Sequence, residues 1–202
     1  GSHVITDSTR YDTINLVRRY LAKEAKVVSN STTNLKNYFQ INRGSKQGIK
    51  DNSAVINSDG SVVGQIVGVS ENFSQALSLL HVHNTVSAMM KKTRNSGRVE
   101  WDGQSSLSLT LRNIPKSDSV LVGDTVLTGI NSFNYPPGWM IGTVSVIVED
   151  KSTNFYVLKV KPSANFHNLQ QVFVIENLKR DEQVLLDKTT QTRVDELNKR
   201  RQ

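Results

Sequence analysis

The sequence INRGSKQGI at residues 41–49, followed by AVINSDGSVVGQIVGVS at residues 54–70, decides the fold class of this chain. Short runs of β-branched residues alternate there with single glycines and polar turns. Runs of this kind, bounded by Gly, Asn, Asp and Ser, are typical of short strands. A glycine inside a strand permits a sharp bend or a close backbone approach. The stretch therefore predicts a small, tightly coiled β-barrel, and it contains no catalytic constellation.

Similar patterns recur at short intervals on both sides of this stretch. We expect strands at residues 25–29, 36–42, 54–56, 62–69, 78–82, 86–90, 97–101, 107–111, 125–127, 142–148, 155–160 and 172–175. We also expect a helical turn at residues 73–77. Evenly spaced short strands separated by turns are typical of all-β barrels. Because strands and helices do not alternate, the pattern argues against an α/β nucleotide-binding fold.

The N-terminal stretch has a different periodicity. Tyr11, Ile14, Val17 and Leu21 recur at the three- and four-residue spacing of one helix face. Residues 4–24 are therefore predicted to form a helical neck. This face would either pack on its own barrel or form a coiled-coil dimer that continues from upstream residues, so the same four residues are our candidates for self-association.

We expect an all-β protein in which an N-terminal helix is followed by two small β-barrel domains. Residues 25–84 would form barrel 1, with residues 164–177 as a candidate closing segment, and residues 85–163 would form barrel 2. Barrels of this size have small hydrophobic cores, so we expect the two barrels to pack against each other. Residues 178–202 are rich in charges of both signs and predict a frayed helix or disorder. Residues 1–3 resemble the scar of a removed tag and are left out of this reasoning.

Composition excludes several kinds of chemistry. The chain contains no cysteine, so disulfides, thiolate nucleophiles and cysteine metal sites are impossible. No apolar run approaches the ~20 residues that a membrane-spanning helix requires. The net charge of +7 suits a soluble basic surface, or else contact with an anionic polymer, a membrane surface or nucleic acid.

Two histidines are the only candidates for a metal site. His81 and His83 lie two residues apart, so on a strand they would share a face. No third ligand is evident nearby, and the simpler interpretation is a half-exposed strand with two polar residues. We expect no metal and no cofactor.

The residue types of a serine-protease triad are present in the chain, but their presence alone does not make a triad. It would combine Ser105 or Ser106 with His81 and with Asp102 or Asp124. A triad is defined by geometry, and no nucleophile motif surrounds either serine. A degenerate barrel protease is therefore an alternative function, and we expect no enzymatic activity.

Nucleic-acid binding is the other alternative. Lys91, Lys92, Arg94 and Arg98 flank one predicted turn and could form a basic patch on a small barrel. Single-stranded nucleic acids also need aromatic side chains on which bases stack. Only Trp101 lies close in sequence to this charge, so the expectation is that no nucleic acid is bound.

One loop is a candidate for protein binding. Residues 133–142 read FNYPPGWMIG, in which two prolines stiffen the chain and a glycine permits a turn. Tyr135, Trp139 and Met140 gather around this turn. Trp, Tyr and Met are enriched at the cores of protein interfaces, so these three residues either cap barrel 2 or form a partner-binding patch.

The order and spacing of short motifs carry a resemblance to a known family. The matching segments are AKVVSNS at 25–31, INRGS at 41–45 with Gly48-Ile49, GSVVGQI at 60–66, VSA at 86–88, Gly97 with WDG at 101–103, Ile114-Pro115, GDTVLTG at 123–129, PPG at 136–138 with IGTV at 141–144, and VFVIEN at 172–177. Over residues 25–177 the chain resembles the envelope domain of rod-shape-determining protein MreC. These motif sequences most resemble those of family members from Bacteroidota-like Gram-negative bacteria.

The resemblance implies a function that the residues alone do not. MreC-like proteins are non-enzymatic scaffolds of the cell-elongation machinery that regulate peptidoglycan synthesis and so maintain rod shape. The implied partners are a class B penicillin-binding transpeptidase, MreD, RodA and MreB, together with a homodimer or higher assembly. The implied location is the periplasmic domain of a single-pass inner-membrane protein, with its membrane helix upstream of Val4.

Overall fold

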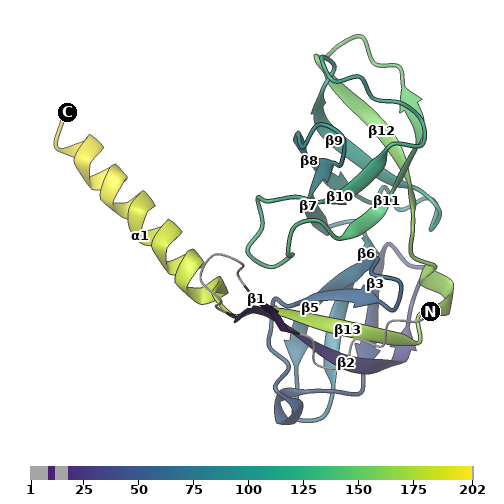
Figure 1. The fold of residues 1–202 in the computed structure, drawn as a ribbon, viewed down its shortest axis with the longest axis vertical. Helices are drawn as coiled ribbons and strands as arrows, with labels where there is room; N and C mark the ends of the chain where they lie inside the picture. Colours follow the sequence, from purple (N-terminus) through teal and green to yellow (C-terminus); the bar gives the residue numbers. More distant parts are fainter. Residues whose placement is uncertain (1–8, 12–17, 202) are drawn as a thin grey trace.

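The computed structural model describes residues 9–11 and 18–201, and these form two barrels and one projecting helix (Figure 1). Barrel 1 is built from seven strands in the order β1-β2-β13-β4-β5-β6-β3, and it closes because β2 also pairs with β3. Its strands are β1 (Thr9–Tyr11), β2 (Arg18–Asn30), β3 (Lys36–Ile41), β4 (Ala54–Asn57), β5 (Val62–Val69), β6 (Ser74–His81) and β13 (Gln171–Asn177). A short 3-10 helix, η1 (Ser45–Gln47), follows β3.

Barrel 2 is a closed sheet in the order β10-β11-β12-β9-β8-β7. Its strands are β7 (Thr85–Met90), β8 (Ser96–Glu100), β9 (Leu109–Pro115), β10 (Thr125–Thr128), β11 (Met140–Val148) and β12 (Phe155–Pro162). The chain then returns through a second 3-10 helix, η2 (Phe166–Asn168), so that β13 enters barrel 1 between β2 and β4. The expected all-β fold with two small barrels is confirmed.

Alternation along the strands places an apolar core inside each barrel. In β3 every second residue is buried, namely Asn37, Phe39 and Ile41. This period of two points one set of side chains inward and the other toward solvent. Fully buried residues at the two barrel centres include Ile56, Ile66 and Leu80 in barrel 1 and Leu109, Leu111, Ile114, Ile141 and Leu158 in barrel 2.

The prediction of an N-terminal helix is wrong for the residues of this stretch that the structure describes. Tyr11 ends β1 and Leu21 lies in β2, whereas Ile14 and Val17 fall outside the described residues. β2 pairs with β13 over seven consecutive positions, from Lys26 opposite Gln171 to Tyr20 opposite Asn177. Pairing with a distant strand thus overrides the helical periodicity that the local sequence shows.

The helical turn predicted at residues 73–77 is also wrong, because β6 begins at Ser74. The backbone there pairs on both sides, with Ser74 opposite Val69 of β5 and Ile41 of β3. The short apolar segment therefore extends a central strand of barrel 1.

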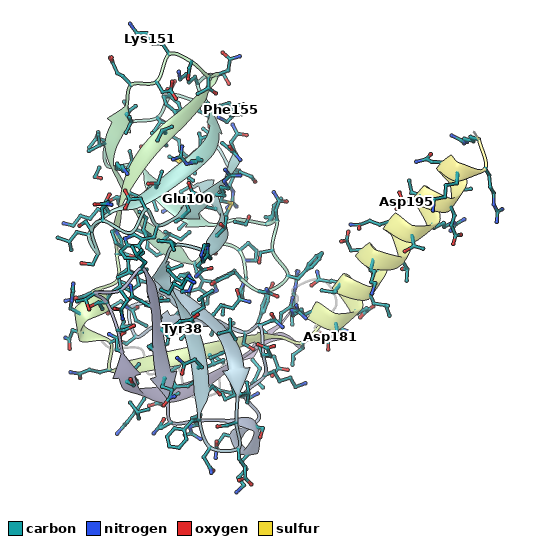
Figure 2. The ribbon with its side chains drawn as sticks, turned by 180° about the vertical axis from the view of Figure 1, so that it is seen from behind. Tyr38, Glu100, Lys151, Phe155, Asp181 and Asp195 are labelled. Carbon is teal, nitrogen blue, oxygen red and sulfur yellow. The ribbon has the colours of Figure 1, made fainter. Side chains whose placement is uncertain are left out.

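The charged tail forms α1 (Arg180–Lys199), a 20-residue helix with no buried residue. Figure 2 shows its far half, marked by Asp195, standing away from both barrels. Among the described residues, hydrogen bonds to barrel 2 are made at its N-terminal end, which we call the root. The Asn177 side chain donates hydrogen bonds to the Phe133 carbonyl (3.0 Å) and to Gln183 (2.9 Å), and Arg180 donates to Asn134 (2.5 Å).

Removal of the projecting part of α1 is expected to leave the barrels unchanged. Deletion of residues 184–202 keeps the root contacts and removes no buried side chain, so the free energy of unfolding should change by less than about 0.5 kcal/mol. Urea unfolding followed by tryptophan fluorescence checks this, and far-ultraviolet circular dichroism should lose helical signal. A large drop in the unfolding midpoint would show that α1 packs on the barrels in solution.

Candidate partner-binding junction between the barrels

The two barrels meet at a junction crossed by the chain twice, at residues 82–84 and at residues 163–170. Ser61 of barrel 1 forms a backbone bridge with Met140 of barrel 2. The Ser163 hydroxyl donates to the Ser61 hydroxyl (2.7 Å), and the Ser163 amide donates to the Ile141 carbonyl (3.0 Å). The second crossing segment and β11 are thereby held close to barrel 1.

The proline-rich loop of barrel 2 is held in one conformation by Thr128. The Thr128 hydroxyl donates to the Pro136 carbonyl (2.7 Å) and accepts from the Trp139 amide (2.8 Å). The Thr128 carbonyl accepts from the Gly138 amide (2.9 Å), and Gly138 has a φ of 89°, which favours glycine. A loop fixed in this way loses little conformational entropy when a partner docks on it.

Tyr135 lies at the centre of the junction. Its side chain is buried, and burial raises the pKa of its hydroxyl well above the usual range, with the Asn84 side chain opposing the shift. Asn84 belongs to the first crossing segment, so Tyr135 joins the loop of barrel 2 to the segment that leaves barrel 1. The tyrosine stays neutral at any physiological pH.

Trp139 and Met140 of the same loop are half-buried. The Trp139 indole packs against the core and covers Gly60 of barrel 1, where an added Cβ would lie 3.5 Å from the ring atom Cζ3. Of the three loop residues singled out from the sequence, Trp139 therefore lies against barrel 1 at Gly60, and Tyr135 lies beside Asn84 of the first crossing. Met140 joins barrel 1 through its backbone bridge with Ser61.

Two exposed apolar side chains of the same loop were not singled out from the sequence. Ile130 is 69% exposed and Phe133 is 37% exposed. Leu178, 40% exposed, follows Asn177, whose amide binds the Phe133 carbonyl. The signal that could have identified them is the presence of large apolar residues close together in a loop, because an exposed apolar patch often marks an interaction site.

A second contact between the barrels involves His167 in η2. Its Nδ1 lies 3.3 Å from the Thr32 hydroxyl of barrel 1, and its Nε2 lies 2.8 Å from the Ser106 hydroxyl of barrel 2. Nearby, Gly103 packs so closely on Leu35 that an added Cβ would lie 2.7 Å from the leucine Cδ2. No sequence pattern around His167 indicates this role.

The geometry does not assemble the protease triad. His81 binds Tyr38 and the His83 amide, and Asp124 accepts from the Leu121 amide. The Ser106–His167 pair has a threonine hydroxyl where a triad needs a carboxylate to orient the imidazole.

Asp102 is also engaged elsewhere, since it accepts a hydrogen bond from Lys159 (2.9 Å). Burial works against ionisation of Asp102, but the bond from Lys159 prevails and lowers its pKa. A carboxylate held in this pair is not available to orient a histidine.

The basic cluster is not arranged as a nucleic-acid platform. Lys92 donates to the Ser119 carbonyl (2.9 Å), and Arg98 lies 4.0 Å from Glu100. Trp101, the only aromatic residue close to it in sequence, is 5% exposed and donates its indole N–H to the Ser105 carbonyl (2.8 Å). A buried indole offers no face on which a base can stack.

The paired histidines are not arranged as a metal site either, because Nδ1 of His81 accepts from the His83 backbone. Within residues 9–11 and 18–201 there is no group of three or more His, Asp or Glu side chains that could hold a metal ion. In the same part of the chain no helix is both long and apolar enough to cross a membrane.

Comparison with known proteins identifies relatives over most of the chain. The family described as "Rod shape-determining protein MreC, barrel core" matches residues 27–176. The cell shape-determining protein MreC of Haemophilus influenzae is 30% identical over 154 residues, which cover 76% of this chain and 43% of that protein. The chain thus spans about half the length of the curated relatives that it matches.

Solved structures share the fold. MreC of Listeria monocytogenes aligns with a TM-score of 0.69 at 26% identity, covering 87% of this chain and 81% of that chain. A second match is a complex between the penicillin-binding protein PBP2 and MreC from Helicobacter pylori, with a TM-score of 0.62 at 18% identity, covering 79% of this chain and 99% of the matched one. At that identity the second match shows the shared fold alone.

Proposed function

Because this chain belongs to the MreC family of rod shape-determining proteins, whose barrel core spans residues 27–176, we propose that it is a non-enzymatic scaffold of the cell-elongation machinery. It would bind and regulate enzymes of peptidoglycan synthesis and so maintain rod shape. It would act as the periplasmic domain of a single-pass inner-membrane protein whose anchor lies upstream of Val4.

The proposed direct partner is a class B penicillin-binding transpeptidase. The family relative from Helicobacter pylori is known in a complex with PBP2, which supports a partner of this class. MreD, RodA and MreB are proposed as partners of the full-length assembly. We propose that the direct contact uses the junction, with Tyr135, Trp139 and Met140 as its base and Ile130 and Phe133 as its exposed rim.

The observation that carries this proposal is the proline-rich loop between β10 and β11, residues 129–139, which we call the junction loop. It combines a fixed backbone, a half-buried indole that lies against barrel 1, and two exposed apolar side chains. Interface hot spots are enriched in Trp and Tyr that lie in well-packed pockets. A rigid loop of this composition is therefore suited to binding a folded protein and has no reacting group to offer a substrate.

Self-association is proposed as a homodimer or higher assembly. Tyr11, Ile14, Val17 and Leu21 remain the proposed stretch, although the described part of it is extended and not helical. β1 is the outermost strand of its sheet, and an edge strand can pair with another chain. Sedimentation of the protein with and without residues 1–17 tests this, and identical monomeric profiles would contradict it.

Trp139→Ala is expected to weaken binding of the transpeptidase by about 2 kcal/mol, the scale of an interface hot spot. The matched control is Phe155→Ala, because Phe155 is an exposed aromatic residue near the far end of barrel 2 (Figure 2) and should leave affinity unchanged. A binding titration with the purified transpeptidase measures both. Since Trp139 also supports the junction, Ile130→Ala, at a residue that is 69% exposed, provides a variant that changes the rim and removes little buried area. Unchanged affinity in both loop variants would exclude this surface.

A further inference from the structure

His81 holds the first crossing segment to barrel 1. It ends β6, its side chain is buried at 4% exposure, and it lies edge-on to the Tyr38 ring with centroids 5.2 Å apart. Its Nδ1 accepts the backbone N–H of His83 (3.1 Å), and its carbonyl accepts that of Asn84 (2.9 Å). The imidazole and its own backbone thus fasten two consecutive residues of the crossing.

The bond to the His83 amide specifies the protonation state of the ring. A backbone N–H can only donate, so Nδ1 of His81 must carry no proton. Its Nε2 then carries the proton and lies 3.2 Å from the Tyr38 hydroxyl, which can accept it. A second proton, on Nδ1, would place two N–H groups against each other and break the bond to the crossing segment.

The surroundings of His81 make protonation of Nδ1 more costly. Burial, together with the nearby His83 and Lys36, lowers the pKa of His81. From barrel 2, Gly103 packs against Val82 of the crossing, and the adjacent carboxylate, Asp102, is paired with Lys159. The negative charge of Asp102, the carboxylate next to Gly103, is therefore already balanced by Lys159.

The crossing segment is coupled to the junction loop through Asn84. The Asn84 amide donates to the Ser78 carbonyl (2.9 Å), which holds it against β6. The same side chain neighbours the buried hydroxyl of Tyr135 in barrel 2. The turn at residues 82–84 therefore lies beside the loop that carries Trp139.

We propose that His81 is a proton-operated latch between the barrels: the neutral imidazole holds the crossing turn closed, and its protonation at low pH releases the turn and loosens barrel 2 from barrel 1. The latch concerns the isolated protein. Its importance for partner binding rests on the proposed function, because it would change the surface on which the transpeptidase docks.

The direction of the pH effect follows from proton linkage. With the pKa of His81 lowered in the closed state, that state binds fewer protons than the released state. Latching is therefore complete above a pH of about 6.5, the ordinary value for histidine, and is lost as the pH falls from there toward the lowered pKa. For a single proton, the ratio of released to closed molecules rises at most tenfold per pH unit.

The first test measures the distance between the barrels. Because the chain contains no cysteine, Asn72→Cys in barrel 1 and Lys151→Cys in barrel 2 give two exposed sites for spin labels. Between pH 7.5 and pH 4.5 the distance distribution should broaden in the otherwise unchanged protein. His81→Asn keeps an oxygen acceptor near the position of Nδ1 but cannot titrate, so its distribution should stay narrow. His83→Asn is the matched control and should keep the response.

A second measurement needs no substitution at His81. In the unchanged protein, the nitrogen chemical shifts of the His81 ring should report an unprotonated Nδ1 at pH 7.5. Hydrogen exchange of the His83 amide, corrected for its intrinsic rate, should accelerate as the ring becomes protonated. An Nδ1 that carries the proton at pH 7.5, or a distance response that persists in His81→Asn, overturns the latch. Neither readout involves the transpeptidase, so the latch and the proposed function can fail separately.

Discussion

Gly64→Ala is expected to lower the free energy of unfolding by about 3 kcal/mol, the upper range for overpacking a core. Gly64 lies in β5 opposite Ser78 of β6. A Cβ there would lie 2.3 Å from the Leu77 carbonyl oxygen and 2.9 Å from the Phe39 ring. Backbone and a buried aromatic ring cannot move aside as the end of a flexible side chain can, so the barrel itself must distort.

Gly68→Ala on the same strand is the matched control. A Cβ at Gly68 would meet only the Cβ of Gln75, at the ordinary contact distance of 3.6 Å. Its effect should lie between neutral and a stabilisation of about 1 kcal/mol, because alanine reduces the entropy of the unfolded chain. Urea unfolding of the two variants measures the difference. Similar losses in both would mean that close packing of β5 on β6 is not what requires glycine.

Glu176→Ala is expected to cost about 2–3 kcal/mol. The Glu176 side chain is 10% exposed and accepts from Lys23 (2.9 Å) and Lys50 (3.2 Å). Removal of the carboxylate would leave the largely buried ammonium of Lys23 with the Gly48 carbonyl as its one remaining partner among the residues that the structure describes. Breaking a buried ion pair costs 3–5 kcal/mol, and the partial exposure of Lys23 reduces this.

The control for this effect is Glu71→Ala. Glu71 pairs with Lys46 at 2.7 Å, but both side chains are more than half exposed, so the loss should be about 0.5 kcal/mol or less. Thermal or urea unfolding at pH 7 compares the two variants. The double replacement Lys23→Met with Glu176→Leu should recover most of the stability, since it leaves no unpaired buried charge and Lys50, the other partner of Glu176, is exposed to solvent. Equal losses for Glu176→Ala and Glu71→Ala would contradict the buried-pair argument.

Local sequence was sufficient where a strand pairs with its neighbours in the chain. The strand predicted at residues 62–69 coincides with β5, and the strand predicted at residues 155–160 lies within β12. In these segments the β-branched residues, the turn residues and the neighbouring hairpin partner all favour the same structure. Agreement between local preference and tertiary pairing leaves little room for error.

Local sequence failed where a distant partner decides the conformation. The residues around Tyr20 show helical periodicity, yet β13, about 150 residues later, draws them into a strand. Single-sequence periodicity cannot register a partner so far along the chain. The position of Trp139 against Gly60 has the same origin, because the two residues belong to different barrels.

By itself, the sequence determined the β class, the number of barrels, the absence of cysteine chemistry and the stiff aromatic loop, because each depends on residue type and short-range spacing. The tertiary structure alone decided that β13 lies between β2 and β4, that Trp139 lies against Gly60 of the other barrel, that His81 contacts Tyr38, and that His167 contacts both barrels. These features arise from contacts between residues that are distant in the chain, and such contacts form only when the whole chain is folded.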